Sequence, residues 1–404
     1  MTQPIGIFPP PAALLVLPPA GDPDALAALL RGDITHLLPP EWNFFEAAVH
    51  GRTKEALEIL ASLDAPIAHY NLFVLQGGDL ARYRHLRANL TPDLASLLQV
   101  AAFQFGLIEE LPLAESLEGE WKAVLLLTRA SRHLENQETT RAIVDLEQAV
   151  ECVRTSSPVF AAQLLGQIAG LRWSAPGQDV SQVIDNYSEA IKLAGNTPLD
   201  GLCAELWLNL GSCYQEHSDG RRDYLTHAIQ AYQQAIQCDL SETNHPEMYA
   251  LAQNNLGLAY LTMPMIEASD DLRKAVAVQS FREALKVYQS HTHRLEWVSA
   301  KLNLANALQH LPSSHPEENL VQAVDIYEEL LQTRSRAEDP VGYARLLANQ
   351  ANALAHLGLF SQSLEKANEA YKLFHWHNEA DSAASVLELV GKVHESLGNK
   401  QVTA

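Results

Sequence analysis

Apolar residues recur along most of this chain at spacings of three and four, which is the period of an α-helix. From residue 121 onward they form paired stripes, and turn-favouring residues separate the stripes. Four such pairs align with one another, at Trp207, Leu210, Gly211, Tyr214, Ala228, Tyr232 and Ala235; at Leu256, Gly257, Tyr260, Ala277, Phe281 and Ala284; at Leu304, Ala305, Leu308, Ala323, Tyr327 and Leu330; and at Leu347, Ala351, Leu354, Gly358, Leu364, Ala367 and Ala370. The pattern predicts a series of helical hairpins with almost no strand.

Small residues stand at fixed places in these stripes. Gly211, Gly257, Ala305 and Ala351 each occupy the first helix of a pair. Packed helices approach each other closely only where side chains are small, and a large neighbouring side chain then fills the adjacent space. We therefore expect these four positions to lie at helix–helix contacts.

The order Trp-x2-Leu-Gly-x2-Tyr, followed by Ala-x3-aromatic-x2-Ala, is most complete between Trp207 and Ala235. It resembles the tetratricopeptide repeat family (TPR). Weaker copies extend the resemblance over residues 120–398, and a last helix near Ser382 to Leu397 is expected to act as a cap. The resemblance implies an all-α fold, an α-solenoid with the right-handed superhelix of TPR-like helical hairpins.

The spacing of the repeats departs from the family. The small anchors fall at 166, 211, 257, 305 and 351, so successive steps are 45, 46, 48 and 46 residues, whereas the ordinary TPR period is 34. We expect the extra residues between the two helices of a pair, at 217–226, 263–274 and 312–319. These loops are either a second contact surface or tolerated surface insertions.

Three segments follow from the pattern. Residues 1–40 form a proline-rich N-terminal segment with one short helical stretch at 24–30. Residues 41–120 form a helical N-terminal region, which is either a set of degenerate repeats packed on the array or a distinct helical domain. Residues 121–398 form the repeat array with its capping helix.

The charge of the chain limits its partners. It has 49 acidic and 28 basic residues and a formal net charge of -21. Such a charge repels phosphate backbones and anionic lipid, so we expect no nucleic-acid partner and no membrane, and instead a protein or peptide that is neutral or basic. The basic clusters at Arg221–Arg222 and at Arg82, Arg84 and Arg87 are too small to reverse this expectation.

The N-terminus and the cysteines favour a cytoplasmic location. No Lys or Arg precedes Arg31, so the basic region of a signal peptide is missing. The apolar run 12–17 is far shorter than the roughly 20 residues of a membrane span. The four cysteines form no Cys-x2-Cys pair, and we expect buried, reduced thiols. The oligomeric state is not specified by the sequence.

Catalytic and cofactor motifs are missing. The chain contains no GxxxxGK[ST], GxGxxG, GxSxG or HExxH sequence, so we expect no enzyme and no cofactor. Two His-x-His pairs, His291 with His293 and His375 with His377, lack the third and fourth ligands of a metal site. We expect surface or helix-end histidines and no bound metal.

A row of asparagines marks the candidate binding site. With each small anchor numbered eight, position six holds Asn209, Asn255, Asn303 and Asn349, position nine includes Asn306 and Asn352, and position five includes Asn254. Asparagine is a mediocre helix former, so this row calls for an explanation. The amide has one acceptor and two donors, which suit the backbone of an extended peptide. The resemblance implies this role, because asparagine ladders line concave grooves in the family; the alternative is hydrogen bonding to the neighbouring helix.

The same register argues against a clamp for a terminal carboxylate. Position five holds Leu208, Asn254, Leu302 and Ala348, where carboxylate clamps of the family carry lysine. We therefore expect a non-catalytic protein–protein interaction scaffold that binds a partner peptide or helix in its concave groove. Two alternatives stay open, a ligand- or peptide-sensing regulator and an assembly chaperone for a larger complex.

Overall fold

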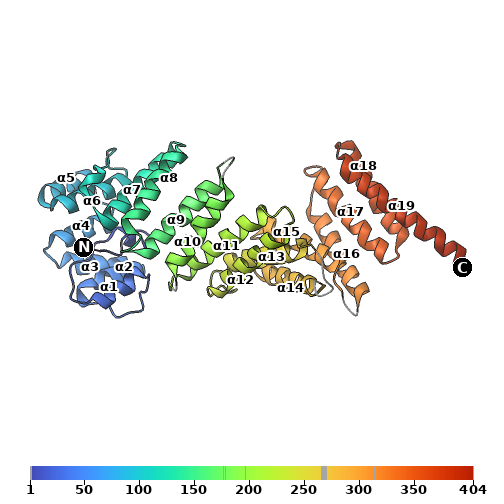
Figure 1. The fold of residues 1–404 in the computed structure, drawn as a ribbon, viewed down its shortest axis with the longest axis horizontal. Helices are drawn as coiled ribbons and strands as arrows, with labels where there is room; N and C mark the ends of the chain where they lie inside the picture. Colours follow the sequence, from blue (N-terminus) through green and yellow to red (C-terminus); the bar gives the residue numbers. More distant parts are fainter. Residues whose placement is uncertain are drawn as a thin grey trace. The chain divides into compact units, whose positions relative to one another are not determined.

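The computed structural model describes residues 2–175, 177, 179–195, 197–264, 271–312 and 315–403. Every regular element in these residues is a helix (Figure 1). The chain divides into two compact units, residues 1–213 and 214–404. The prediction of an all-α chain in which neighbouring helices pack as pairs is confirmed for the described residues. None of the described helices combines the length and the apolar character that a membrane crossing requires.

The first unit begins with short helices and continues with longer pairs. Its helices are α1 (Pro23–Leu30), α2 (Asn43–Val49), α3 (Thr53–Ala61), α4 (Pro66–Gln76), α5 (Leu80–Asn89), α6 (Pro92–Gln104), α7 (Gly119–Glu135), α8 (Thr139–Val153), α9 (Pro158–Trp173) and α10 (Val180–Ala194). Three short 3-10 turns lie at Ala12–Leu14, Pro40–Trp42 and Ala114–Ser116. The boundary between the two units falls inside α11 (Asp200–Glu216).

The second unit is a series of helices that have 16 to 18 residues each, except for the last one, which has 24 residues. They are α12 (Arg222–Gln237), α13 (Pro246–Thr262), α14 (Asp271–Val287), α15 (Arg294–Gln309), α16 (Pro316–Thr333), α17 (Pro340–His356), α18 (Phe360–Trp376) and α19 (Ala380–Thr403). Consecutive helices pack against each other throughout this unit, and α13 also contacts α15. Stripe residues of α13 to α18 therefore meet in one core within this unit.

Local sequence signals explain where the helices begin. Proline stands in the first turn of α9, α13 and α17, where its missing N–H costs nothing. The side chain of Asp339 caps α17 by accepting from the backbone N–H of Gly342 at 2.8 Å, and Asp22 caps α1 in the same way. These caps satisfy backbone donors that the helix itself leaves free.

The predicted stripes form the core. Tyr232, Phe281 and Tyr327, the aromatic residues of three second helices, are each at most 1% exposed. The alanines that flank them in the pattern are equally buried, and so are Ala305 and Ala351 in the first helices. The interpretation of these positions as helix–helix contacts is therefore confirmed.

Gly257 shows why one of these positions has no side chain. A Cβ atom at Gly257 on α13 would lie 2.8–3.0 Å from three ring atoms of Phe281 on α14. Gly166 on α9 has the same relation to the next first helix, because its Cβ would lie 2.8 Å from Leu206 on α11. Close helix approach thus excludes even a methyl group at both positions.

The long repeat period has a different origin from the predicted one. Helices α13 and α14 have 17 residues each, and α15 and α16 have 16 and 18, so each pair already holds 34 helical residues. The remaining residues are shared between connections within pairs, such as 310–315, and connections between pairs, such as 288–293 and 334–339. The expectation that the extra residues lie only within pairs is wrong. The short turn after α17 is as predicted, with three residues between His356 and Phe360.

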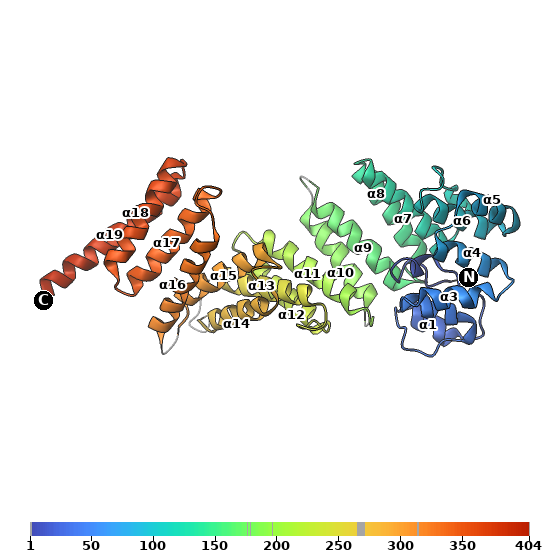
Figure 2. The same cartoon turned by 180° about the vertical axis from the view of Figure 1, so that it is seen from behind.

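The proline-rich start of the chain is buried in the first unit. Ile5, Ile7 and Leu15 are at most 2% exposed, although this stretch contains no helix longer than one 3-10 turn. In both views the N-terminus lies beside α3 and α4 (Figure 2). The predicted short helix at 24–30 corresponds to α1, and residues 41–104 include the helices α2 to α6, whereas residues 105–118 contain only one 3-10 turn.

The cysteines differ from the prediction. Cys203 and Cys238 are disulfide-bonded, whereas Cys152 and Cys213 carry free thiols. The expectation of four reduced thiols is therefore wrong for two of them. The sequence gave no signal for this, because neither cysteine belongs to a Cys-x2-Cys pair.

Candidate partner-binding face

The asparagine row of the second unit is carried by three first helices. Asn254 and Asn255 lie on α13, Asn303 and Asn306 on α15, and Asn349 and Asn352 on α17. All six side chains are partly exposed, while the small anchors beside them on the same helices are buried. The helical register thus turns these amides away from the core without exposing them fully. Asn209, on α11 in the first unit, is also partly exposed.

Two of the amides on α17 hydrogen-bond to α15. Asn349 Nδ2 donates to Asn306 Oδ1 at 3.1 Å, and Asn352 Nδ2 donates to Gln309 Oε1 at 3.0 Å. These contacts join residues 43 positions apart and fix the two first helices side by side. For these residues the structure matches the alternative in which the row bonds to a neighbouring helix.

A buried tyrosine extends this network into the core. The Tyr327 hydroxyl on α16 donates to Asn306 Oδ1 at 2.6 Å and accepts a hydrogen bond from Gln309 Nε2. Tyr327 is fully buried, and its burial raises the pKa of the phenol well above the usual value, so the hydroxyl stays protonated. The phenol is therefore a fixed donor that orients the amide of Asn306.

Other members of the row have free hydrogen-bonding capacity. The Asn254 Oδ1 atom is buried and has no hydrogen-bond partner among the described residues, while Asn254 Nδ2 makes a long contact of 3.4 Å to Asn255 Oδ1. Within the described part of the chain, the side chain of Asn303 has no hydrogen bond, and neither does that of Asn209. These amides can donate to or accept from an added backbone.

Apolar side chains lie between the amides. Leu258 and Leu302 pack partly against the core of the second unit, as does Ala348 on α17. Leu251, one turn before Asn254 on α13, is 43% exposed. The face therefore combines amides that suit a peptide backbone with apolar surface that suits its side chains.

The sequence pattern was used to select asparagines as candidate site residues, and the glutamines of this network were not among them. Gln309 stands four residues after the small anchor Ala305, and Gln215 stands four residues after Gly211, whereas Leu261 has this place after Gly257. The equivalent tyrosine, Tyr232, donates to Gln215 Oε1 at 2.8 Å. A recurring glutamine paired with the aromatic residue of the second helix was thus a signal that the sequence already contained.

The histidine pairs have no metal-site geometry. His291, His375 and His377 are exposed, and His293 lies 3.5 Å from a carboxylate oxygen of Glu247. Among the described residues, no group of three or more histidine, cysteine, aspartate or glutamate side chains is arranged to hold a metal ion.

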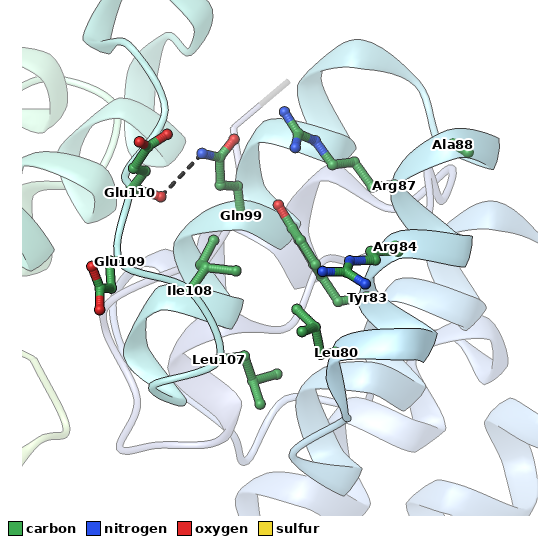
Figure 3. Close-up of a pocket in the computed structure, with 10 residues that line it drawn as sticks. All are labelled: Leu80, Tyr83, Arg84, Arg87, Ala88, Gln99, Leu107, Ile108, Glu109 and Glu110. Carbon is green, nitrogen blue, oxygen red and sulfur yellow. Dashed lines mark hydrogen bonds between the residues drawn. The ribbon is translucent and has the colours of Figure 1, made fainter.

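A separate open cavity of about 780 Å³ lies in the first unit, between α5, α6 and the segment that follows α6. It is lined by Leu80, Tyr83, Arg84, Arg87, Ala88, Gln99, Leu107, Ile108, Glu109 and Glu110. Arg84 and Arg87 lie on the α5 side, and Glu109 and Glu110 lie on the opposite side (Figure 3). The Gln99 side chain donates to the Glu110 carbonyl at 3.0 Å and so holds that wall in place. Neither arginine pairs with an acidic group in the described residues, which leaves two guanidinium groups available to an anion.

Comparison with known proteins gives only distant similarities. No protein-family model and no curated protein matches the chain. Solved structures that match include Pseudomonas aeruginosa PilF, at 18% identity and a TM-score of 0.41 over 66% of this chain and 96% of that one. A Rap protein complexed with competence and sporulation factor matches at 14% identity and a TM-score of 0.40, over 88% and 94%. A signal-transduction ATPase of Pyrococcus horikoshii with a tetratricopeptide repeat sensor matches at 12% identity and a TM-score of 0.45, over 85% and 52%.

Proposed function

We propose that the protein is a non-catalytic scaffold that binds an extended segment or a helix of a partner protein on the face of α13, α15 and α17. The observation that carries this proposal is the amide of Asn303. It is partly exposed, makes no hydrogen bond to any described residue, and stands on a helix held in place by the Asn306–Asn349 bond. A free amide on a fixed helix is suited to an added backbone.

The row then has two roles. Asn306, Asn349 and Asn352 hold neighbouring helices together, so that the face is already formed before a partner arrives. Asn255 and Asn303 supply donors and acceptors to the partner, and the unpartnered Asn254 Oδ1 accepts one of its N–H groups. A preformed face lowers the ordering cost of binding. Like Asn303, Asn209 on α11 of the first unit supplies donors and an acceptor to the partner.

The partner is neutral or basic. The net charge of -21 opposes an acidic partner, a nucleic acid or an anionic membrane. The apolar residues Leu302 and Ala348 at position five replace the lysines of a carboxylate clamp, so the partner is held along its backbone and its apolar side chains. The same chemistry serves an assembly chaperone, which differs only in the identity of the partner.

A binding measurement on one double variant tests this proposal. Partners are first captured from the source cell and identified by mass spectrometry. Replacing Asn255 and Asn303 together by Ala removes two backbone contacts, and we expect roughly five- to hundredfold weaker binding. The melting temperature is expected to stay the same or rise slightly, because Ala is the better helix former. Asn368→Ala, an exposed change on α18, is the matched control. Unchanged binding with a clear fall in melting temperature contradicts the proposal.

A second candidate is a ligand-sensing regulator, which the cavity beside α5 favours. Its volume is within the range of small-molecule sites, and two unpaired arginines offer bidentate contacts to a carboxylate or phosphate. A ligand of this class is expected to raise the melting temperature of the native chain. The Arg84→Ala/Arg87→Ala double variant is expected to lose that rise, while Arg336→Ala, on an exposed arginine of the second unit, keeps it.

A cytoplasmic location is proposed from the N-terminal sequence alone, because the cysteines no longer support it. Two of the four cysteines are disulfide-bonded, and such bonds are typical of oxidising compartments. Fractionation of the source cell with an antibody to the chain decides the location.

A further inference from the structure

The first residues of the chain are held as a bound peptide is held. Residues 2–18, here called the N-terminal segment, contain only one short 3-10 turn. Backbone groups of this segment are paired with side chains of distant helices. Buried backbone groups need partners, and most segments find them in their own secondary structure. Here some partners lie within the segment, such as the Gln3 side chain on the Leu17 backbone, and the others are side chains on other elements.

The clearest contact is made by Asn71 on α4. The Val16 N–H donates to Asn71 Oδ1 at 2.9 Å, and Asn71 Nδ2 donates to the Val16 carbonyl at 2.7 Å. The Asn71 side chain is fully buried. Its amide oxygen and its amide nitrogen both bond to the backbone of Val16. Both hydrogen bonds are made to backbone atoms, so they do not depend on the side chain of residue 16.

Two neighbouring contacts follow the same rule. The buried Tyr70 hydroxyl donates to the Leu14 carbonyl at 3.0 Å, and the Trp42 indole N–H donates to the Pro18 carbonyl at 2.9 Å. The apolar side chains of Leu15, Val16 and Leu17 are buried at 2% exposure or less. Backbone recognition is thus combined with apolar burial along this end of the segment.

The other end of the segment lies on α9. Gln163 Nε2 donates to the Ile7 carbonyl at 3.1 Å. Gly6 has a φ of +81°, and a Cβ atom there would lie 2.4 Å from the Phe160 ring. Gln163 stands three residues before the small anchor Gly166, which is the register of Asn254 before Gly257 on α13. A side-chain amide at this register therefore holds a backbone carbonyl of the segment, at the turn that brings Gly6 N–H to the Ala13 carbonyl.

We propose that Asn71 and Tyr70 on α4, with Phe160 and Gln163 on α9, form a peptide-binding site that the N-terminal segment occupies as a built-in and exchangeable ligand. The site takes an apolar peptide that folds back on itself, with its Gln3 side chain bonded to the Leu17 backbone and its Gly6 against Phe160. The segment joins the rest of the chain through Pro19 to Gly21, where Gly21 is exposed and has no atom within 4 Å of its Cβ position. An outside segment of the same chemistry competes for this site, and that competition does not depend on the face of α13, α15 and α17.

The test uses the full chain with a protease recognition sequence inserted between Ala20 and Gly21. After cleavage, we expect the released fragment to stay bound during size-exclusion chromatography. An excess of isotope-labelled synthetic peptide with the sequence of residues 2–20 is then expected to replace it, as followed by native mass spectrometry. Cleaved protein that unfolds, or that keeps its fragment against any excess of peptide, shows that the segment is an inseparable part of the core and overturns the proposal.

Altered peptides test the recognition without changing the protein. A peptide with N-methylated Val16 leaves Asn71 Oδ1 without its donor, and we expect it to compete roughly five- to 150-fold less well. A Gly6→Ala peptide places a methyl group against the Phe160 ring and is expected to compete at least about tenfold less well. If both altered peptides exchange as readily as the native one, burial alone holds the segment and the assigned site is wrong.

A protein variant completes the test. Gln163→Ala is expected to speed the exchange of the native peptide, because the Ile7 carbonyl loses its donor. Gln167→Ala, on the exposed side of the same helix, is the matched control and is expected to leave the exchange rate unchanged. Equal exchange rates for the two variants contradict a role for Gln163 in the site.

Discussion

Asn349 on α17 donates from Nδ2 to Oδ1 of Asn306 on α15, at a distance of 3.1 Å. Both residues belong to one row in the sequence, yet Asn303, at the same register on α15 as Asn349 on α17, has no such bond among the described residues. Residues that look equivalent in the repeat pattern therefore have different surroundings, and they are expected to respond differently to the same substitution.

Asn349→Ala removes the bond between α17 and α15, and we expect the free energy of unfolding to fall by about 0.5–1.5 kcal/mol. Asn303→Ala breaks no bond and replaces a mediocre helix former by a good one, so stability is expected to stay equal or rise by a few tenths of a kcal/mol. Chemical denaturation of the two variants and the parent checks this. A loss of stability with Asn303→Ala at least as large as with Asn349→Ala contradicts the distinction.

Gly257→Ala is expected to destabilise the second unit by about 1–3 kcal/mol, because the new methyl group meets the Phe281 ring. Gly391→Ala is the matched control on α19, where a Cβ has open space and the helix gains about 0.5–1 kcal/mol from the better helix former. Thermal unfolding of both variants should shift in opposite directions. A shift of the same sign in both would show that Gly257 is not limited by packing.

The Glu328 carboxyl has a pKa below its usual value, chiefly because Gln350 Nε2 donates to it at 3.0 Å, with Lys366 Nζ at 3.2 Å as a second cause. A depressed pKa in the folded state gives stability that is present above the unfolded pKa, near 4.3, and is lost as the pH falls through the folded value. Gln350→Leu removes the first donor. As the pH falls from 7 to 3, we therefore expect the free energy of unfolding to decrease more in the parent than in the variant, measured by denaturation at both pH values. A difference that does not change with pH contradicts the assignment.

The disulfide-bonded state of Cys203 and of Cys238 predicts the number of reactive thiols. In denaturant without reductant, we expect two thiols per chain, from Cys152 and Cys213, and four after reduction. In the native protein the reaction is expected to be slower, because Cys213 is buried and burial raises the pKa of the Cys152 thiol. Four thiols in unreduced, denatured protein would show that the bond does not form.

Particular residues show how far sequence reasoning reached. The burial of Tyr232, Phe281 and Tyr327 followed from helical period alone, because a stripe at spacings of three and four has one possible core side. The origin of the long repeat period did not follow, because the ends of helices depend on caps and packing that the period does not encode. The division of the chain at residues 40 and 120 stays a prediction, and so does the binding role of the asparagine row.

What the sequence determined by itself is the local part of the molecule: helices, their buried stripes, the small anchors and the positions of the asparagines. These features depend on residues a few positions apart, which the period of the helix brings together. Only the tertiary structure decided that Asn306 bonds to Asn349, that Gln163 holds the Ile7 carbonyl 156 positions away, and that Asn71 holds Val16 across 55 positions. An amide has the same donors and acceptor wherever it stands, so its partner is set by which helices pack together and not by the residues beside it in the chain.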